Sequence, residues 1–153
     1  MNTNAPFFAK NEIIQLNKNG IWTSDGTEIT HEQTRKLFSK SIVKTKSGYQ
    51  LHIRKEIFDI EVEDTAYFVE RIEGSSMSGF NLLLNDESKQ KLTPQTLKYT
   101  PGRLTCQIKT KANQLEDAKF LHIAYFDLLK NIEEDDRCYF LTIENKKTSL
   151  LNK

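Results

Sequence analysis

The chain has 153 residues with 22 Lys and Arg against 21 Asp and Glu, so its formal net charge is +1. A balance of this kind argues against a dedicated nucleic-acid binder, because such proteins usually carry a strongly basic domain or stripe. Nine Phe, five Tyr and one Trp argue against a disordered chain, so we expect a folded domain with a highly charged surface.

Membrane and secretory segments are not indicated by the pattern. No apolar run approaches about 18 residues, so we expect no transmembrane helix and no membrane partner. The first 16 residues lack the basic and apolar regions of a secretory signal, and residues 1–11 are expected to form an N-terminal tail. Cys106 and Cys138 have no metal-ligand spacing, and a cytoplasmic location with reduced thiols is favoured over a Cys106–Cys138 bond.

Short strands and turns precede the first predicted helix. Residues 12–16 are a short β-type run, and residues 21–23 and 28–29 are predicted to pair across the tight turn at Asp25-Gly26. Thr30 is a suitable N-cap and Gln33 completes a capping box, so a helix is predicted over residues 31–42.

Alternating strands separate this helix from a second one. A hairpin is expected at Ser47-Gly48, and the Gly- and Ser-rich residues 74–79 are expected to form a hairpin loop. Cys106 alternates with apolar neighbours and is expected to be buried. The second helix is predicted over residues 114–132, followed by an exit loop (residues 133–136) and a last strand (residues 137–143). Its apolar stripe comprises Leu115, Ala118, Leu121, His122, Tyr125, Leu128, Leu129 and Ile132.

Two helices among many short strands predict an α+β fold rather than a parallel βαβ sheet. We expect two small, similar lobes, residues 12–73 and 74–153, each a helix packed on short, mostly antiparallel strands. A motif Tyr-x-Leu-x-Ile follows each helix, at Tyr49 and at Tyr139, 90 residues apart. The pattern is either a coincidence between ordinary strands or a duplicated helix-then-strand unit.

Residues 20–68 carry an ordered set of turn glycines, aromatic and apolar residues, and acidic residues. These positions are Gly20, Trp22, Gly26, Ile29, Leu37, Phe38, Gly48, Tyr49, Leu51, Glu56, Ile60, Val62, Glu63, Asp64 and Phe68. The pattern resembles a bacterial family, the domain of unknown function 1285 family, and a weaker match extends the resemblance to about residues 13–150. The resemblance implies a two-lobed α+β fold with repeated motifs and the binding role in signal transduction proposed for the family, with no established catalytic activity. We expect no cofactor.

The chain departs from that family pattern at three places. Asn19 stands where an Asp is usual, Arg54-Lys55 precedes Glu56 where a proline is usual, and His122 stands where an Arg is frequent. These departures bear on any ligand site that the family shares.

Polar side chains on otherwise apolar elements give the main site hypothesis. His122 and Tyr125 of the second predicted helix are expected to combine with Gln50, His52 and Arg54 of one strand face. A cleft between two lobes is a favoured place for a ligand. We therefore expect a non-enzymatic protein that binds a small molecule or a protein partner, neither of which the sequence specifies.

Two alternatives remain open at this point. Glu56, Glu63 and Asp64 could hold a divalent cation in a small hydrolase, although the pattern also fits a solvated strand and a turn. The strand at residues 137–143 could make the protein a structural interaction module by pairing through an exposed edge.

Trp22 is the only tryptophan, and we expect it to pack in the core rather than to bind a ligand. It stands in a patterned strand, where an aromatic side chain usually packs. We expect its ring to cover the first helix near Phe38, and its N–H to need one acceptor. The glycines Gly20, Gly26 and Gly48 are expected at turns.

Overall fold

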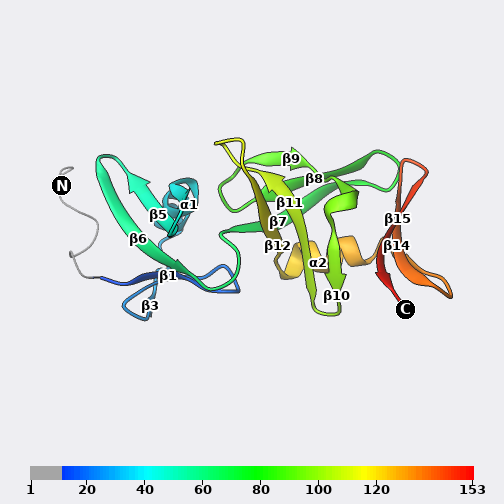
Figure 1. The fold of residues 1–153 in the computed structure, drawn as a ribbon, viewed down its shortest axis with the longest axis horizontal. Coiled ribbons are helices and arrows are strands. Elements are labelled where there is room, and N and C mark those ends of the chain that lie inside the picture. Colours follow the sequence, from blue (N-terminus) through cyan, green and yellow to red (C-terminus); the bar gives the residue numbers. More distant parts are fainter. Residues whose placement is uncertain (1–11) are drawn as a thin grey trace. The chain divides into compact units, whose positions relative to one another are not determined.

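The computed structural model describes residues 12–153 and divides the chain into two compact units, with the boundary after Ala66 (Figure 1). The predicted tail, residues 1–11, lies outside the described residues. Within the described residues, strands dominate both units and each unit has one α-helix. Among the described residues, no helix is sufficiently long and apolar to cross a membrane.

The first unit is a single six-stranded sheet with one helix. Its strand order is β3-β2-β1-β6-β5-β4, and all neighbours are antiparallel except the parallel pair β1 and β6. The elements are β1 (Ile14–Leu16), β2 (Trp22–Ser24), β3 (Thr27–Glu28), α1 (Glu32–Lys40), β4 (Ile42–Thr45), β5 (Gly48–Ile53) and β6 (Glu56–Val62).

Trp22 and Phe38 are central to the core of this unit, as expected. Trp22 is 1% exposed, and its ring meets that of Phe38 edge-on at a centroid distance of 5.4 Å. Its indole N–H donates to the hydroxyl of the buried Ser39 at 3.3 Å. The three glycines Gly20, Gly26 and Gly48 have positive φ angles of 79°, 82° and 147°, in agreement with their predicted place at turns.

The first helix is shorter than predicted and is capped by a different residue. His31 is the N-cap, because its Nδ1 accepts from the backbone N–H of Thr34, so the expected capping box of Thr30 and Gln33 is wrong. The helix ends at Lys40, where the Ser41 hydroxyl donates back to the Leu37 carbonyl at 2.6 Å. The β-branched Ile42 then starts β4 instead of ending the helix.

The second unit contains a six-stranded sheet and a three-stranded sheet. The orders are β10-β11-β12-β7-β8-β9 and β13-β14-β15. Its elements are β7 (Tyr67–Ser75), β8 (Gly79–Leu84), β9 (Lys89–Lys91), the short 3-10 helix η1 (Pro94–Thr96), β10 (Lys98–Thr100), β11 (Arg103–Lys109), β12 (Leu115–Phe120), α2 (His122–Leu129), β13 (Ile132–Glu134), β14 (Cys138–Ile143) and β15 (Lys146–Asn152). Strand β7 belongs here and not to the first lobe, because it pairs with β8 and, in parallel, with β12.

The prediction of the second helix is wrong for its first half and confirmed for part of its second half. Its first part is strand β12, in which Glu116, Ala118 and Phe120 alternate inward, and α2 covers only His122–Leu129. The apolar spacing at Leu115 and Ala118 fits a helix as well as a strand, and pairing with β11 and β7 decides in favour of the strand.

The C-terminal residues also differ from expectation. The predicted exit loop contains most of β13, and β15 was not anticipated. The strand predicted at residues 137–143 is β14, which is the central strand of its sheet, paired on both sides. It therefore has no free edge, and the interaction module that relied on that edge is not supported by this geometry.

The elements that follow α1 recur 90 residues later. Helix α2 begins 90 residues after α1, and β14 and β15 repeat the bounds of β5 and β6 at the same offset. Strand registers agree as well, because Ile42 pairs with Leu51 and Ile132 pairs with Leu141. One difference is clear: β1 and β6 are hydrogen-bonded neighbours, whereas β11, which contains the positions 90 residues after β1, and β15 belong to separate sheets.

Candidate functional site

Helix α2 is apolar on nearly all sides, although only one side is covered. Ala124 and Leu128 are fully buried on the side that contacts β7 and β12. On the other side, Ile123 is 48% exposed and Phe126 is 47% exposed. Helices of globular proteins normally present charged or polar groups to solvent, so a second apolar face indicates a surface meant for contact.

A cavity of about 330 Å³ lies beside this face, between the start of α2 and strands β7 and β8. Its walls are a mixture of apolar, charged and imidazole side chains, namely Glu70, Arg71, Leu83, Leu121, His122 and Ile123. We call these six residues together with Phe126 the α2 face.

A β-bulge shapes the wall of this cavity. Between β7 and β8 the register passes from Val69–Leu84 to Arg71–Leu83, so Glu70 is the extra residue of the bulge. Val69 is buried, whereas Glu70 and Arg71 are both exposed. The bulge thus directs two successive charged side chains to the surface where regular alternation would direct one.

Arg71 is the charged group of this wall that is available to a ligand. Among residues 12–153 it makes no ion pair or hydrogen bond through its side chain, whereas Glu70 already takes part in interactions within the fold. A guanidinium presents several N–H donors in a fixed plane that matches a carboxylate. The α2 face can therefore accept an apolar group and an acidic group side by side.

An aromatic chain connects the α2 face to the neighbouring strands. The ring of Phe126 meets His122 at 4.8 Å and Tyr125 at 5.2 Å between centroids, both edge-on. The Tyr125 hydroxyl accepts from the backbone N–H of Gly102 at 2.9 Å. Burial raises the pKa of Tyr99, and the neighbouring Tyr125 hydroxyl raises it further. These contacts fix the rings at the rim of the face.

The predicted five-residue site falls into two groups, one in each unit. His122 and Tyr125 are joined through Phe126 in the second unit, while Gln50, His52 and Arg54 are in the first. The Gln50 amide donates to Asp59 at 3.0 Å and its oxygen lies 3.0 Å from His52 Nε2. Arg54 occupies the β5–β6 turn with a φ of 57°.

The carboxylates of the alternative metal site do not cluster. Glu56 begins β6 and Glu63 directly follows it, which places them about 23 Å apart at the rise of an extended strand. Within residues 12–153 no three His, Cys, Asp or Glu side chains come together as a metal site would require. Glu63 instead accepts from the Lys18 N–H at 2.7 Å, and one buried oxygen of Glu56 has no hydrogen-bond partner in the described chain.

Two neighbours of His122 were missed by the sequence reasoning. Ile123 and Phe126 fall inside the predicted helix and outside its apolar stripe. These additional large apolar residues could have indicated a second apolar face on the helix. Glu70, Arg71 and Leu83 gave no such signal, because the bulge that groups them depends on pairing between β7 and β8.

Solved structures identify the fold. A DUF1285 family protein from Silicibacter pomeroyi DSS-3 superposes with a TM-score of 0.67 at 15% sequence identity, covering 91% of this chain and 79% of its own. A second, from Shewanella baltica OS155, gives a TM-score of 0.59 at 18% identity and covers 80% and 94%. The chain has the fold of DUF1285 family proteins.

The resemblance seen in the sequence is thus confirmed at the level of the fold. No family model matches the sequence, and no curated protein matches it. At these identities the two structures show the fold alone.

Proposed function

We propose that the protein is a non-enzymatic binding protein whose α2 face takes a segment of a partner protein. The partner segment presents one large apolar side chain to the cavity and a carboxylate to Arg71. The observation that supports this most is the pair of half-exposed residues Ile123 and Phe126 beside a cavity lined by an arginine.

Covering these two side chains favours binding. Burying a large apolar side chain completely is worth about 1.5 to 3 kcal/mol. Because Ile123 and Phe126 are each about half exposed, covering both contributes about 2 kcal/mol in total. An aromatic anchor near a pocket and an arginine are the residue types that dominate binding energy at protein interfaces.

Two broader proposals accompany this one. The recurrence of elements at an offset of 90 residues supports an origin of the two lobes from one duplicated helix-then-strand unit. At that offset, Ile123 and Phe126 correspond to the polar residues Gln33 and Lys36, so the apolar face belongs to the second lobe alone. A binding protein without a catalytic group is suited to the signal-transduction role that the family resemblance suggests.

Peptide display tests the proposed face without requiring a candidate partner. A library of random peptides is selected against the full chain, and the affinity of enriched peptides is measured by calorimetry. We expect enriched sequences to combine a large apolar residue with an acidic one. Phe126→Ser and Arg71→Gln should each weaken binding about tenfold, the loss expected when an anchor or a charged hydrogen bond is removed.

Leu115→Ser is the matched control, because Leu115 is 64% exposed in the same unit and outside the α2 face. It should leave peptide affinity unchanged. Peptides that bind Phe126→Ser and Arg71→Gln as tightly as the original chain would overturn the proposal, and so would a selection that enriches nothing.

A further inference from the structure

A second cavity, independent of the α2 face, lies where three connections of the second unit meet. It measures about 490 Å³, which is within the range of small-molecule sites. We call it the hairpin cavity, because Ser76 and Met77 of the β7–β8 turn form one wall. The other walls include Asn131 after α2, Glu133 of β13, Thr142 of β14 and Asn145 of the β14–β15 turn.

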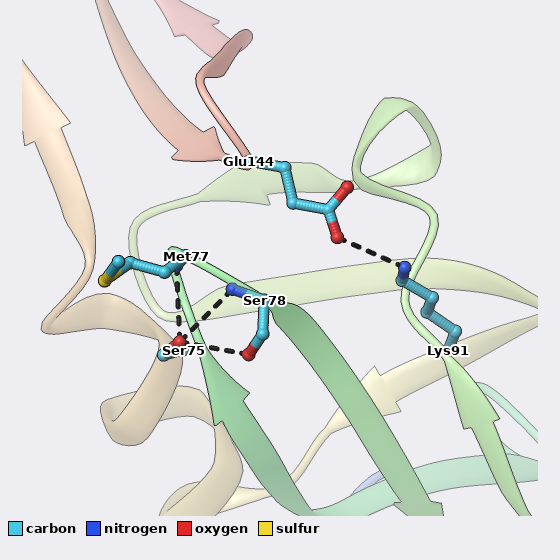
Figure 2. Close-up of polar contacts among 5 residues, drawn as sticks. All are labelled: Ser75, Met77, Ser78, Lys91 and Glu144. Carbon is cyan, nitrogen blue, oxygen red and sulfur yellow. Dashed lines mark hydrogen bonds and ion pairs between the residues drawn. The ribbon is translucent and has the colours of Figure 1, made fainter.

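Hydrogen bonds hold the walls of this cavity in place (Figure 2). The Ser75 hydroxyl accepts from the backbone N–H groups of Met77 and Ser78, both at 3.3 Å, which orders the hairpin tip. The Glu144 N–H donates to the Ser76 carbonyl at 2.8 Å. Lys91 Nζ lies 3.3 Å from the Glu144 carboxylate, so an ion pair ties the end of β9 to the β14–β15 turn.

Polar groups in the cavity are left without protein partners. Among residues 12–153, the side chains of Ser76, Glu133, Thr142 and Asn145 make no hydrogen bond or ion pair. Asn131 uses its Nδ2 to donate to the Asp127 carbonyl at 3.1 Å, which leaves its side-chain oxygen available. The carboxylate and the amide oxygens only accept, and the two hydroxyls can both accept and donate, so unused acceptor positions outnumber the unused donors.

The charge in the cavity is negative and localised. Lys130 also lines it, but its ammonium lies 3.6 Å from the Asp127 carboxylate. Glu144 is neutralised by Lys91, so Glu133 is the carboxylate left without a counter-ion in the described chain. Met77 is 86% exposed and points away from the Lys91–Glu144 pair in Figure 2. Its flexible thioether side chain suits an alkyl group.

We propose that the hairpin cavity binds a small organic cation rich in N–H donors, an amine or guanidine on a short alkyl chain. Glu133 pairs with the cationic group, and the oxygens of Asn131, Thr142 and Asn145 accept from the remaining N–H donors. Met77 covers the methylene chain.

Agmatine is the probe, because it has a guanidinium and an ammonium joined by methylenes. Backbone amide resonances of the full chain are followed by NMR as agmatine is added. We expect saturable shifts at Ser76, Thr142 and Asn145. Glu133→Gln should weaken binding about tenfold, since a hydrogen bond to a charged group is lost. Asn145→Gly should also weaken it, and glycine keeps the φ of 66° that Asn145 adopts.

Glu134→Gln is the matched control, because Glu134 is next on the same strand and its carboxylate already pairs with Lys153 at 2.7 Å. It should bind agmatine like the original chain. The spectrum of each variant shows whether it is folded. Absence of saturable shifts at about 10 mM, where even millimolar sites fill, would overturn the proposal. Equal affinity in Glu133→Gln, or equal binding of the dicarboxylate succinate, would overturn it too.

Discussion

Individual side chains in the first unit show which residue roles can be derived from sequence. The burial of Trp22 and its contact with Phe38 were predictable, because both lie in patterned elements close together in the chain. Its acceptor, Ser39, was not predictable, since a serine inside a helix gives no sign that it faces the core. The cap His31 was missed for a similar reason, because Thr30 is the more usual N-cap type.

Removing the Trp22 ring should destabilise the protein strongly. Trp22→Ala is expected to cost about 3 to 5 kcal/mol through the cavity it leaves. Ser39→Ala should cost about 1 to 3 kcal/mol, because the buried indole N–H then has no acceptor. Urea unfolding measures both values. Equal stability of Ser39→Ala and the original chain would show that the hydrogen bond contributes nothing.

The Cys106 thiol should be inert while the chain is folded. Burial, with a smaller contribution from the nearby Asp117, raises its pKa to about 12, so almost no thiolate exists at neutral pH. Iodoacetamide should therefore alkylate Cys106 only after denaturant is added, as mass spectrometry of peptides would show. Rapid alkylation in buffer alone would contradict the burial of this side chain.

Asp135 should make the stability of the folded state depend on pH in the acidic range. A hydrogen bond from Lys147 and two from the N–H groups of Arg137 and Cys138 hold its pKa well below the ordinary 3.8. A lowered pKa in the folded state stabilises it above pH 3.8, and this contribution is lost as the pH falls further. The stability difference between Asp135→Asn and the original chain should therefore shrink below pH 3.8. A difference that stays constant down to pH 2 would contradict this.

The sequence predicted secondary-structure elements well where a local turn sets the strand register. It predicted them poorly where pairing with a distant strand sets it. The β4–β5 and β7–β8 hairpins followed from Ser-Gly and Gly-rich turns close in the chain. Strand β12 was read as helix because its apolar spacing is ambiguous, and only pairing with β11 and β7 resolves it. Strands β13 and β15 were missed because they are polar and depend on β14.

The β7–β8 hairpin depends on glycine at one position in particular. A Cβ at Gly74, which has a φ of 121°, would overlap the Gly79 carbonyl oxygen across the hairpin. A Cβ at Gly26, with a φ of 82°, meets nothing. Gly74→Ala should thus lower the unfolding midpoint clearly more than Gly26→Ala, for which backbone strain of about 1 kcal/mol is the main cost. Thermal unfolding followed by circular dichroism compares the two, and equal midpoints would contradict the tight hairpin.

At the scale of the whole molecule, the sequence predicted the fold but only part of the proposed binding face. The fold family and the 90-residue recurrence were visible, because both depend on the order of turns and apolar residues along the chain. The α2 face was only half visible, since His122 was recognised and Arg71 was not. Arg71 reaches the face through a bulge between β7 and β8, a feature of pairing that periodicity does not encode.

We propose that the protein binds its partner at the α2 face and not at another surface. The most direct measurement is an NMR map of amide shifts on the full chain when a display-selected peptide is added. We expect shifts concentrated at Arg71, His122, Ile123 and Phe126, and we expect these shifts to be lost in Phe126→Ser while the rest of the spectrum is preserved. Saturable shifts confined to residues elsewhere in the chain would contradict it.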